Sequence, residues 1–223
     1  MGTSLYFKYP PESLFGGKRT LNIGCGYAQY RTPNVVNLDA YDRCKPDVVW
    51  DLEHMPLPFE DNSFDLILAN HILEHVRGGW ALFAECGRVL KPNGRMEIYV
   101  PGNGSDSIRG YRDHVAQISA EWFAGTFANY RSGGNAWADE HVNDYAIRMK
   151  LVKTCSVMQK YWWLRGPYFW KSFCANHLRN TVLEQGFTFR KVTEEEFHSE
   201  KAAYEKRMSG ILPMLPVQSA DVL

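Results

Sequence analysis

The chain has 223 residues, 45% of them hydrophobic, and its 25 basic residues are balanced by 25 acidic ones. That length allows one core with an elaborate insertion, and a net charge of zero argues against a global field that recruits nucleic acid. The absence of an eighteen-residue apolar run and of a signal-peptide core argues against a transmembrane or secreted protein.

The five cysteines are odd in number and show no Cys-x-x-Cys spacing. This pattern indicates reduced thiols rather than a disulfide framework or a zinc site. We therefore expect no bound metal and a cytoplasmic location.

Short apolar runs at 20–24, 35–39, 47–50, 64–69 and 95–100 resemble strands, and helical patterns fall between several of them. This alternation predicts an α/β fold, a Rossmann-like, doubly wound and mostly parallel sheet with helices on both faces. One helix is expected at 81–90, stopped by Pro92. Another is expected at 172–186, closing at Gly186, followed by a strand at 187–192.

The pattern divides the chain into five parts. We expect an N-terminal extension at 1–18, a cofactor-binding core at 19–101 and a helical, aromatic-rich insertion after the fifth strand at 102–171. Residues 172–200 would then supply the closing helix and the last strand of the core. Residues 201–223 would form a tail, whose last dozen residues show no clear period.

The first apolar run breaks at Gly24 and Gly26, and the second ends at Asp39. Glycine allows backbone N–H groups to face a ligand, and an aspartate ending the next strand can accept hydrogen bonds from a ribose diol. The dinucleotide fingerprint needs a third glycine at position 29, where this chain has Gln29. The pattern thus favours a cofactor with one nucleoside and no phosphate over NAD.

Six ordered motifs within residues 19–101 carry a family resemblance: 21–26, 36–39, 47–52, 57–67, 73–75 and 88–94. At these positions the chain resembles the small, single-domain, type-11-like class I S-adenosylmethionine-dependent methyltransferases. The resemblance implies S-adenosylmethionine as cofactor and S-adenosylhomocysteine as product, with Asp39 on the ribose and Asp51 and Leu52 on the adenine. The residues implied in cofactor binding are Asn22, Gly24, Cys25, Gly26, Asp39, Ala40, Asp51, Leu52, Asn70 and His71.

Two positions depart from the family pattern. Asn22 stands where an acid is usual, and Ala28 where a further glycine is common. Asparagine brings no negative charge to offset a cationic cofactor. An alternative therefore stays open, a catalytically inactive cofactor-binding or interaction protein on the same fold.

Methyl transfer is an in-line displacement at a sulfonium methyl, and the acceptor can need a base to remove its proton. The candidate bases are His71, His114 and His141. His114 is favoured because many of these small methyltransferases place a comparable pair after the fifth strand, before a helix. That helix is expected here at 119–130, with Ser119 as its N-cap.

Residues 71–75 also match the inverted zinc-protease signature His-x-x-Glu-His. On a helix, His71 and His75 would share a face and could bind one zinc ion, with Glu74 as base. That signature needs a long helix and a distant acidic ligand, whereas here it directly follows a strand. A zinc hydrolase is therefore a remote alternative.

The insertion has an unusual composition, since residues 145–183 contain no acid and seven aromatic residues crowd into 161–173. Ile147, Leu151, Cys155, Met158 and Trp162 fall on one helical stripe, which predicts an amphipathic helix. In the first reading this is an ordinary surface helix whose lysines are solvated. In the second it lines an aromatic, positively charged opening of the acceptor-binding site. In the third it lies on a membrane or on a second subunit. The acceptor residues in the second reading are Trp162, Trp163, Arg165 and Trp170.

The predicted function is methyl transfer to an O or N atom of a small or mid-sized, possibly anionic acceptor such as a nucleotide or sugar phosphate. Nucleic acid is disfavoured as a substrate, although not excluded, because residues 69–72 lack the Pro-Pro-aromatic tail of DNA amino-methyltransferases. The chain also has no Pro-Cys nucleophile of the carbon-5 type.

Overall fold

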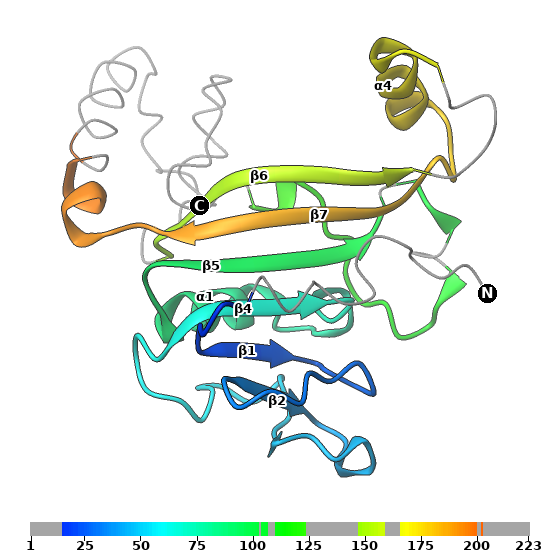
Figure 1. Ribbon diagram of the computed structural model, residues 1–223. Coiled ribbons are helices and arrows are strands. Elements are labelled where there is room, and N and C mark those ends of the chain that lie inside the picture. The colour runs from blue at the N-terminus through cyan, green and yellow to red at the C-terminus, as the bar shows by residue number, and fades with distance from the viewer. Residues whose placement is uncertain are drawn as a thin grey trace, which may run out of the picture.

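The structure is a computed structural model that describes residues 15–102, 104–106, 110–123, 147–158, 166–199 and 202. One seven-stranded sheet, in the order β3-β2-β1-β4-β5-β7-β6, runs through these residues (Figure 1). The strands are β1 (Thr20–Ile23), β2 (Val35–Asp39), β3 (Val48–Val49), β4 (Phe64–Asn70), β5 (Leu90–Pro101), β6 (Met149–Met158) and β7 (Val182–Lys191). The helices are α1 (Gly79–Val89) and α4 (Tyr168–His177), with 3-10 turns η2 (Asp42–Cys44), η3 (Leu73–His75) and η4 (Glu121–Phe123).

Strands β1 to β5 pair in parallel, whereas β7 is antiparallel to both β5 and β6. The mostly parallel Rossmann-like sheet is thus confirmed, and each of the five predicted strands between 20 and 100 overlaps an observed one. Parallel strands end at the same edge of a sheet, so the segments after β1, β2 and β4 meet at one side of the molecule.

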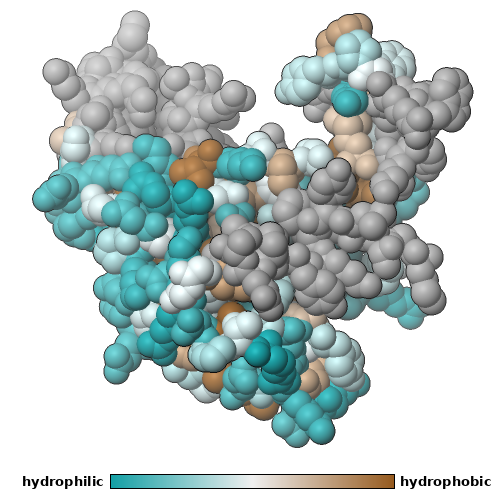
Figure 2. Space-filling model, viewed as in Figure 1, coloured by the Kyte–Doolittle hydropathy of each residue, from teal (hydrophilic) through white to brown (hydrophobic). Residues whose placement is uncertain are grey.

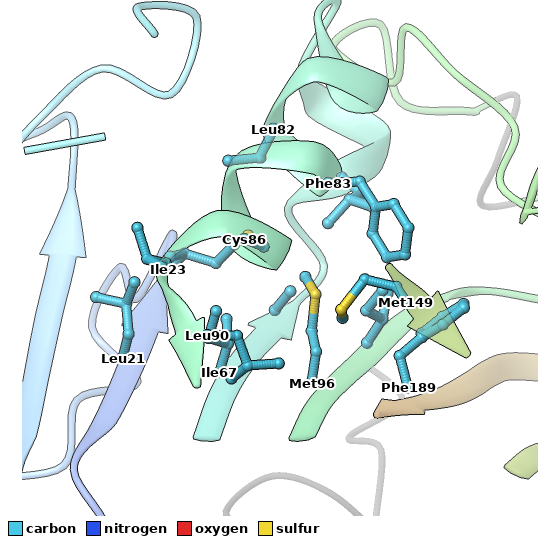
Figure 3. Close-up of a cluster of buried hydrophobic side chains, with 14 of the residues drawn as sticks. Leu21, Ile23, Ile67, Leu82, Phe83, Cys86, Leu90, Met96, Met149 and Phe189 are labelled. Carbon is cyan, nitrogen blue, oxygen red and sulfur yellow. The ribbon is translucent and has the colours of Figure 1, made fainter. Parts of the chain in front are cut away.

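The main core lies between α1 and the sheet (Figures 1 and 3). Leu82, Phe83 and Cys86 of α1 belong to this core, and Phe83 points toward Met149 and Phe189 (Figure 3). Residues of β4 alternate between this core and the opposite face of the sheet, where a smaller cluster packs. That cluster consists of Phe15, Val35, Leu66 and Leu68. The predicted helix at 81–90 is confirmed, except that it ends at Val89 and Leu90 already opens β5.

The link from β1 to β2 contains no helix, although a glycine turn after β1 normally leads into one. Residues 24–34, all within the part that the structure describes, form turns and bends only. The backbone turns through Gly24 and Gly26, at φ 60° and 48°. No helix N-terminus therefore faces the carboxyl end of β1.

The predicted amphipathic helix from Ile147 to Trp162 is wrong over its described part. Residues 149–158 form β6, which pairs antiparallel with β7 and closes one edge of the sheet. Ile147 and Met149 are buried and Leu151 is half-buried, so the inward positions alternate with period two. The outward Lys150 and Lys153 belong to an edge strand, where lysine discourages further pairing.

Two other helix predictions also need correction. The helix expected at 172–186 is α4, which spans Tyr168–His177, and Gly186 lies in the middle of β7. At 119–130 the described residues contain only the turn η4, with Trp122 N–H donating to Ser119 O at 3.2 Å. Within the portion described, every helix is too short or too polar to cross a membrane.

Candidate functional site

A cleft opens at the carboxyl ends of β1 and β4. Ligands of open parallel sheets bind at this edge, beyond the ends of the strands. Of the predicted cofactor residues, Asn22, Gly24, Cys25 and Asn70 line the cleft, whereas Gly26, Asp39, Ala40, Asp51, Leu52 and His71 are not among its lining residues. The remaining lining residues are Ala28, Tyr30, Leu68, Ala69 and Tyr99.

Gly24 is required at its position for two reasons. Its φ of 60° is one that residues with side chains seldom adopt, and a Cβ here would lie 2.4 Å from Cγ1 of Ile72. Ile72, just after β4, therefore rests directly against the glycine turn. The two loops that enclose the cleft are packed against each other.

Asp39 ends β2 and orders the glycine turn. Its side chain accepts hydrogen bonds from Gly26 N–H at 2.8 Å and from Tyr41 N–H at 2.9 Å, and the residue is only 8% exposed. The carboxylate is thus held beside the cleft by backbone donors. Each oxygen keeps a second acceptor position that a ribose hydroxyl could use.

Asn22 is 4% exposed, and both N–H groups of its side-chain amide donate hydrogen bonds within the protein. Nδ2 donates to Ala28 O at 3.0 Å and to Asn37 Oδ1 at 3.1 Å. Asn37 in turn donates to Asp47 Oδ2 at 2.7 Å and to Tyr30 O at 3.0 Å. This network stabilises the loop between β1 and β2, which contains no helix. We therefore infer that Asn22 positions the loop residues that line the cleft.

Cys25 follows Gly24 in the cleft. Burial, together with the charges of Asp39 and Cys44, raises the pKa of the Cys25 thiol to about 12. The thiol is therefore protonated at neutral pH and is no nucleophile. All five cysteines of the chain are free thiols.

Asp51 and Leu52 lie beyond β3 on the neighbouring loop. Asp51 Oδ1 accepts from Glu53 N–H at 3.0 Å, and its Oδ2 lies 3.3 Å from His54 Nδ1. Leu52 is buried in the main core. Asp51 is thus a turn-forming residue here, and its contact with adenine stays a prediction.

His71 lies between two carboxylates. Its Nδ1 is 3.0 Å from Glu74 Oε1, and its Nε2 is 3.3 Å from Glu184 Oε1 of β7. Burial alone would lower the pKa of His71, but hydrogen bonds and charges from Glu184 and Glu74 outweigh it and raise the pKa to about 9. The imidazole is therefore protonated at neutral pH. Because an imidazolium has no lone pair to accept a proton, this arrangement argues against His71 as the base.

The zinc-hydrolase alternative fails on the same geometry. Residues 71–75 do not form the helix that it needs, because His71 has φ 51° and only Leu73–His75 form a single 3-10 turn. Both ring nitrogens of His71 are taken by carboxylates. His71 and His75 thus do not share a helix face.

The other candidate residues are dispersed. His114 packs edge-on against His75, with ring centroids 4.6 Å apart, rather than lining the cleft. Trp170 lies on α4, stacked on Phe173 with centroids 5.8 Å apart. His141, Trp162, Trp163 and Arg165 lie outside the described residues.

Sequence reasoning missed three side chains that shape the site. Tyr30 and Tyr99 line the cleft, and Glu184 binds His71 from 113 positions away in the chain. Tyr99 could have been found, since it lies near the carboxyl end of the fifth predicted strand. Glu184 carries no local signal, because only the pairing of β7 with β5 brings it to β4.

Comparison with known proteins supports this assignment of the core. Residues 21–98 match the family model of a methyltransferase domain, Methyltransf_11. The chain is 32% identical over 105 residues to a sterol 4-C-methyltransferase of Caenorhabditis elegans, covering 47% of this chain and 30% of that protein. It is 28% identical over 103 residues to a ubiquinone biosynthesis O-methyltransferase of Rhodopseudomonas palustris, covering 39% of this chain and 41% of that protein. The chain thus spans less than half the length of these curated relatives.

Solved structures agree on the fold. One is a candidate methyltransferase in complex with the Haloferax volcanii activator Trm112, with a TM-score of 0.52, 14% identity and coverage of 80% of this chain and 83% of that one. Another is a candidate methyltransferase of Bacillus halodurans, with a TM-score of 0.50, 14% identity and coverage of 79% and 93%. Residues 21–98 thus match a methyltransferase domain, and the strand order and the cleft at the ends of β1 and β4 are consistent with the core of a class I S-adenosylmethionine-dependent methyltransferase.

Proposed function

We propose that this protein transfers the methyl group of S-adenosylmethionine to an O or N atom of a small or mid-sized acceptor. The observation that carries the proposal is the glycine turn at Gly24 and Gly26, held beside the cleft by the buried carboxylate of Asp39. The methionine part of the cofactor would lie against the turn, and the ribose diol would donate to Asp39. The cofactor supplies the electrophilic methyl group.

Charge at the cleft suits a cationic sulfonium. Asn70, the last residue of β4, lines the cleft, and the next residue is His71, flanked by Glu74 and Glu184. An imidazolium between two carboxylates has a formal net charge of −1. Burial, followed by the charges of Glu97, Cys155 and Glu184, raises the pKa of Tyr99, which lines the cleft. The three side chains thus offset the charge that Asn22 lacks.

The same charge bears on the acceptor. A nucleotide or sugar phosphate would have to keep its phosphate away from Glu184 and Glu74, so we infer that the reacting end of the acceptor is neutral. Two relatives are named a sterol 4-C-methyltransferase and a ubiquinone biosynthesis O-methyltransferase, and these names are compatible with an acceptor whose reacting end is neutral. Any anionic group would need to lie toward the cationic residues 148–179.

The test separates binding from turnover. Calorimetric titration with S-adenosylmethionine and with S-adenosylhomocysteine should give micromolar binding at one site per chain. Release of S-adenosylhomocysteine is then followed by mass spectrometry, with phenols, alcohols, amines, sugar phosphates and nucleotides as acceptors. Turnover with one acceptor class supports the proposal, and absence of cofactor binding contradicts it.

The inactive cofactor-binding protein is the second candidate, and Asn22 in place of an acid is the feature that favours it. Tight cofactor binding without turnover across all acceptor classes would select it. Methylated product, identified by mass spectrometry, would exclude it.

A further inference from the structure

Three side chains that could bind a metal ion lie close together next to His71, and one of them, Glu74, also pairs with His71. Glu74 and His75 belong to η3, and His114 comes from the segment after β5. One ligand atom from each residue lies within 4.8 Å of the other two. No other trio of His, Cys, Asp or Glu side chains in the described part of the chain lies as close.

Two polar atoms of this cluster are buried and lack a hydrogen-bond partner: Glu74 Oε2 and His114 Nδ1. Buried polar atoms are nearly always satisfied, and each orphan costs about 1–3 kcal/mol. The Glu74 residue is only 2% exposed, so bulk water does not compensate its carboxylate. A single cation between the two side chains would satisfy both atoms at once.

The neighbours of the cluster leave the right atoms available. Glu74 Oε1 is taken by His71 at 3.0 Å, which leaves Oε2 for another partner. His75 Nδ1 lies 3.2 Å from Asp113 O and 3.3 Å from Asp113 Oδ2, so it donates there and its Nε2 keeps the lone pair. A carbonyl or carboxylate behind the non-ligating nitrogen is the usual support of a metal-bound histidine.

The backbone already holds the two segments together. Glu74 O accepts from Val115 N–H at 2.8 Å and from Ala116 N–H at 3.2 Å. The His75 and His114 rings meet edge-on, with centroids 4.6 Å apart. Backbone hydrogen bonds and a ring contact therefore both hold the segment that carries His114 against η3.

We propose that Glu74, His75 and His114 bind one divalent transition-metal ion, best matched by zinc, which fastens the segment after β5 onto η3. Two imidazoles and one carboxylate form a typical zinc ligand set, with a fourth position left for water. Bonds of about 2.1 Å put tetrahedral ligand atoms about 3.4 Å apart, so side-chain rotation has to close at most about 1.4 Å. The ion would hold the two segments together and would not contact the reacting atoms, although its charge would offset part of the negative charge of Glu74.

The test is a titration of the chelator-stripped, full-length chain with zinc chloride alone, followed by calorimetry. We expect one ion per chain. His114→Ala should weaken the affinity by more than about tenfold, since changes behind the ligands already cost 10- to 100-fold. His198→Ala is the matched control, because that histidine is exposed and lies outside the cluster, and it should bind zinc as the unchanged protein does.

Cobalt substitution gives a readout independent of the variants. Cobalt bound by two imidazoles, a carboxylate and water should show the strong visible bands of a tetrahedral site. The weak bands of an octahedral ion, equal zinc affinity in His114→Ala and the unchanged protein, or no stoichiometric binding would each overturn the proposal. If circular dichroism shows that His114→Ala is unfolded, His114→Gln and the cobalt spectrum of the unchanged chain decide the question.

Discussion

Asp39 is oriented by the protein before any ligand binds. Its two backbone hydrogen bonds, from Gly26 and Tyr41, join the glycine turn to the start of the next loop. A side chain that is already held in its binding geometry loses little conformational entropy when the ligand binds, so the loss in binding free energy is small. The same carboxylate of Asp39 thus stabilises the glycine turn and is available for the proposed hydrogen bonds with the ribose.

Replacing Asp39 with Ala should weaken the binding of S-adenosylhomocysteine. Loss of a charged acceptor costs about 1.5–3 kcal/mol, which is roughly 10- to 150-fold in affinity. Calorimetry measures the affinity, and circular dichroism checks that the chain stays folded. Asp39→Asn, which keeps one acceptor oxygen, should lie between the two. Unchanged affinity in Asp39→Ala would disprove the ribose contact.

The Cys25 thiol should resist alkylation in the native protein. With a pKa of about 12, roughly 1 in 10,000 of these thiols is ionised at pH 8, compared with about a quarter for an ordinary thiol. Labelling by iodoacetamide should therefore be on the order of 1,000-fold slower than in the urea-unfolded chain. Mass spectrometry of the tryptic peptides measures both rates. Labelling at equal rates would show that the thiol is neither buried nor neutral.

At the scale of elements, the antiparallel ribbon of β7 and β6 depends on one glycine. A Cβ at Gly186 would lie 2.6 Å from Cys155 Sγ of β6 and 2.6 Å from a ring carbon of Tyr99 of β5. The three strands approach closely only because this position has no side chain. The spacing of the ribbon is thus set in the middle of β7.

Gly186→Ala should destabilise the protein by about 1–3 kcal/mol, because its methyl group would force the neighbouring strands apart. Chemical unfolding in urea gives the free energy of unfolding for the comparison. Gly110→Ala is the matched control, since a Cβ there meets nothing within 4 Å. An equal, small effect of both substitutions would contradict the close packing of β6 on β7.

Helix α4 lies at the end of the β6–β7 ribbon and exposes an aromatic surface. Figure 2 shows apolar colour on this helix, at the upper right in the view of Figure 1. The exposed aromatic residues are Tyr168, Phe169, Trp170 and Phe173. Trp170 is one of the four residues, with Trp162, Trp163 and Arg165, that we propose to contact the acceptor.

Replacement of Trp162, Trp163 and Trp170 by Ala should leave the affinity for S-adenosylhomocysteine unchanged and abolish acceptor turnover. The reason is that Trp170 of α4 is not among the residues that line the cleft. Calorimetry gives the first quantity and product formation the second. Leu178→Ala, at another exposed apolar residue near α4, serves as the control. A loss of cofactor affinity instead would contradict the acceptor assignment.

At the scale of the whole molecule, cofactor binding should be visible as added stability. A ligand that binds only the native state adds about 2.7 kcal/mol at 100 times its dissociation constant. For a chain of this size each kcal/mol raises the Tm by about 2–4 °C, so S-adenosylhomocysteine should raise it by roughly 5–10 °C. NAD at the same concentration should have no effect, because Gln29 replaces the third glycine of the dinucleotide turn. A comparable rise with NAD would refute the cofactor assignment.

The sequence predicts the part of this fold that depends on local pattern. Strands β1 to β5 and α1 were predicted because their apolar residues alternate or recur within a few positions, and Gly24 and Asp39 follow from strand ends. The helix predicted at 147–162 was wrong over its described part because positions four apart, such as Ile147 and Leu151, fit one face of a strand as well as a helical stripe. Only pairing with β7, more than thirty residues later, selects the strand.

For the candidate site, too, some features follow from local sequence and others only from the tertiary structure. The sequence by itself determined the fold class and predicted the cleft at the strand ends, together with the turn and carboxylate proposed to bind the cofactor, because each follows from residues close together in the chain. Only the tertiary structure decided the charge state of His71, the use of Asn22 within the loop and the meeting of Glu74 with His114. These depend on side chains brought together from distant segments, and burial among those neighbours sets both their protonation and their partners.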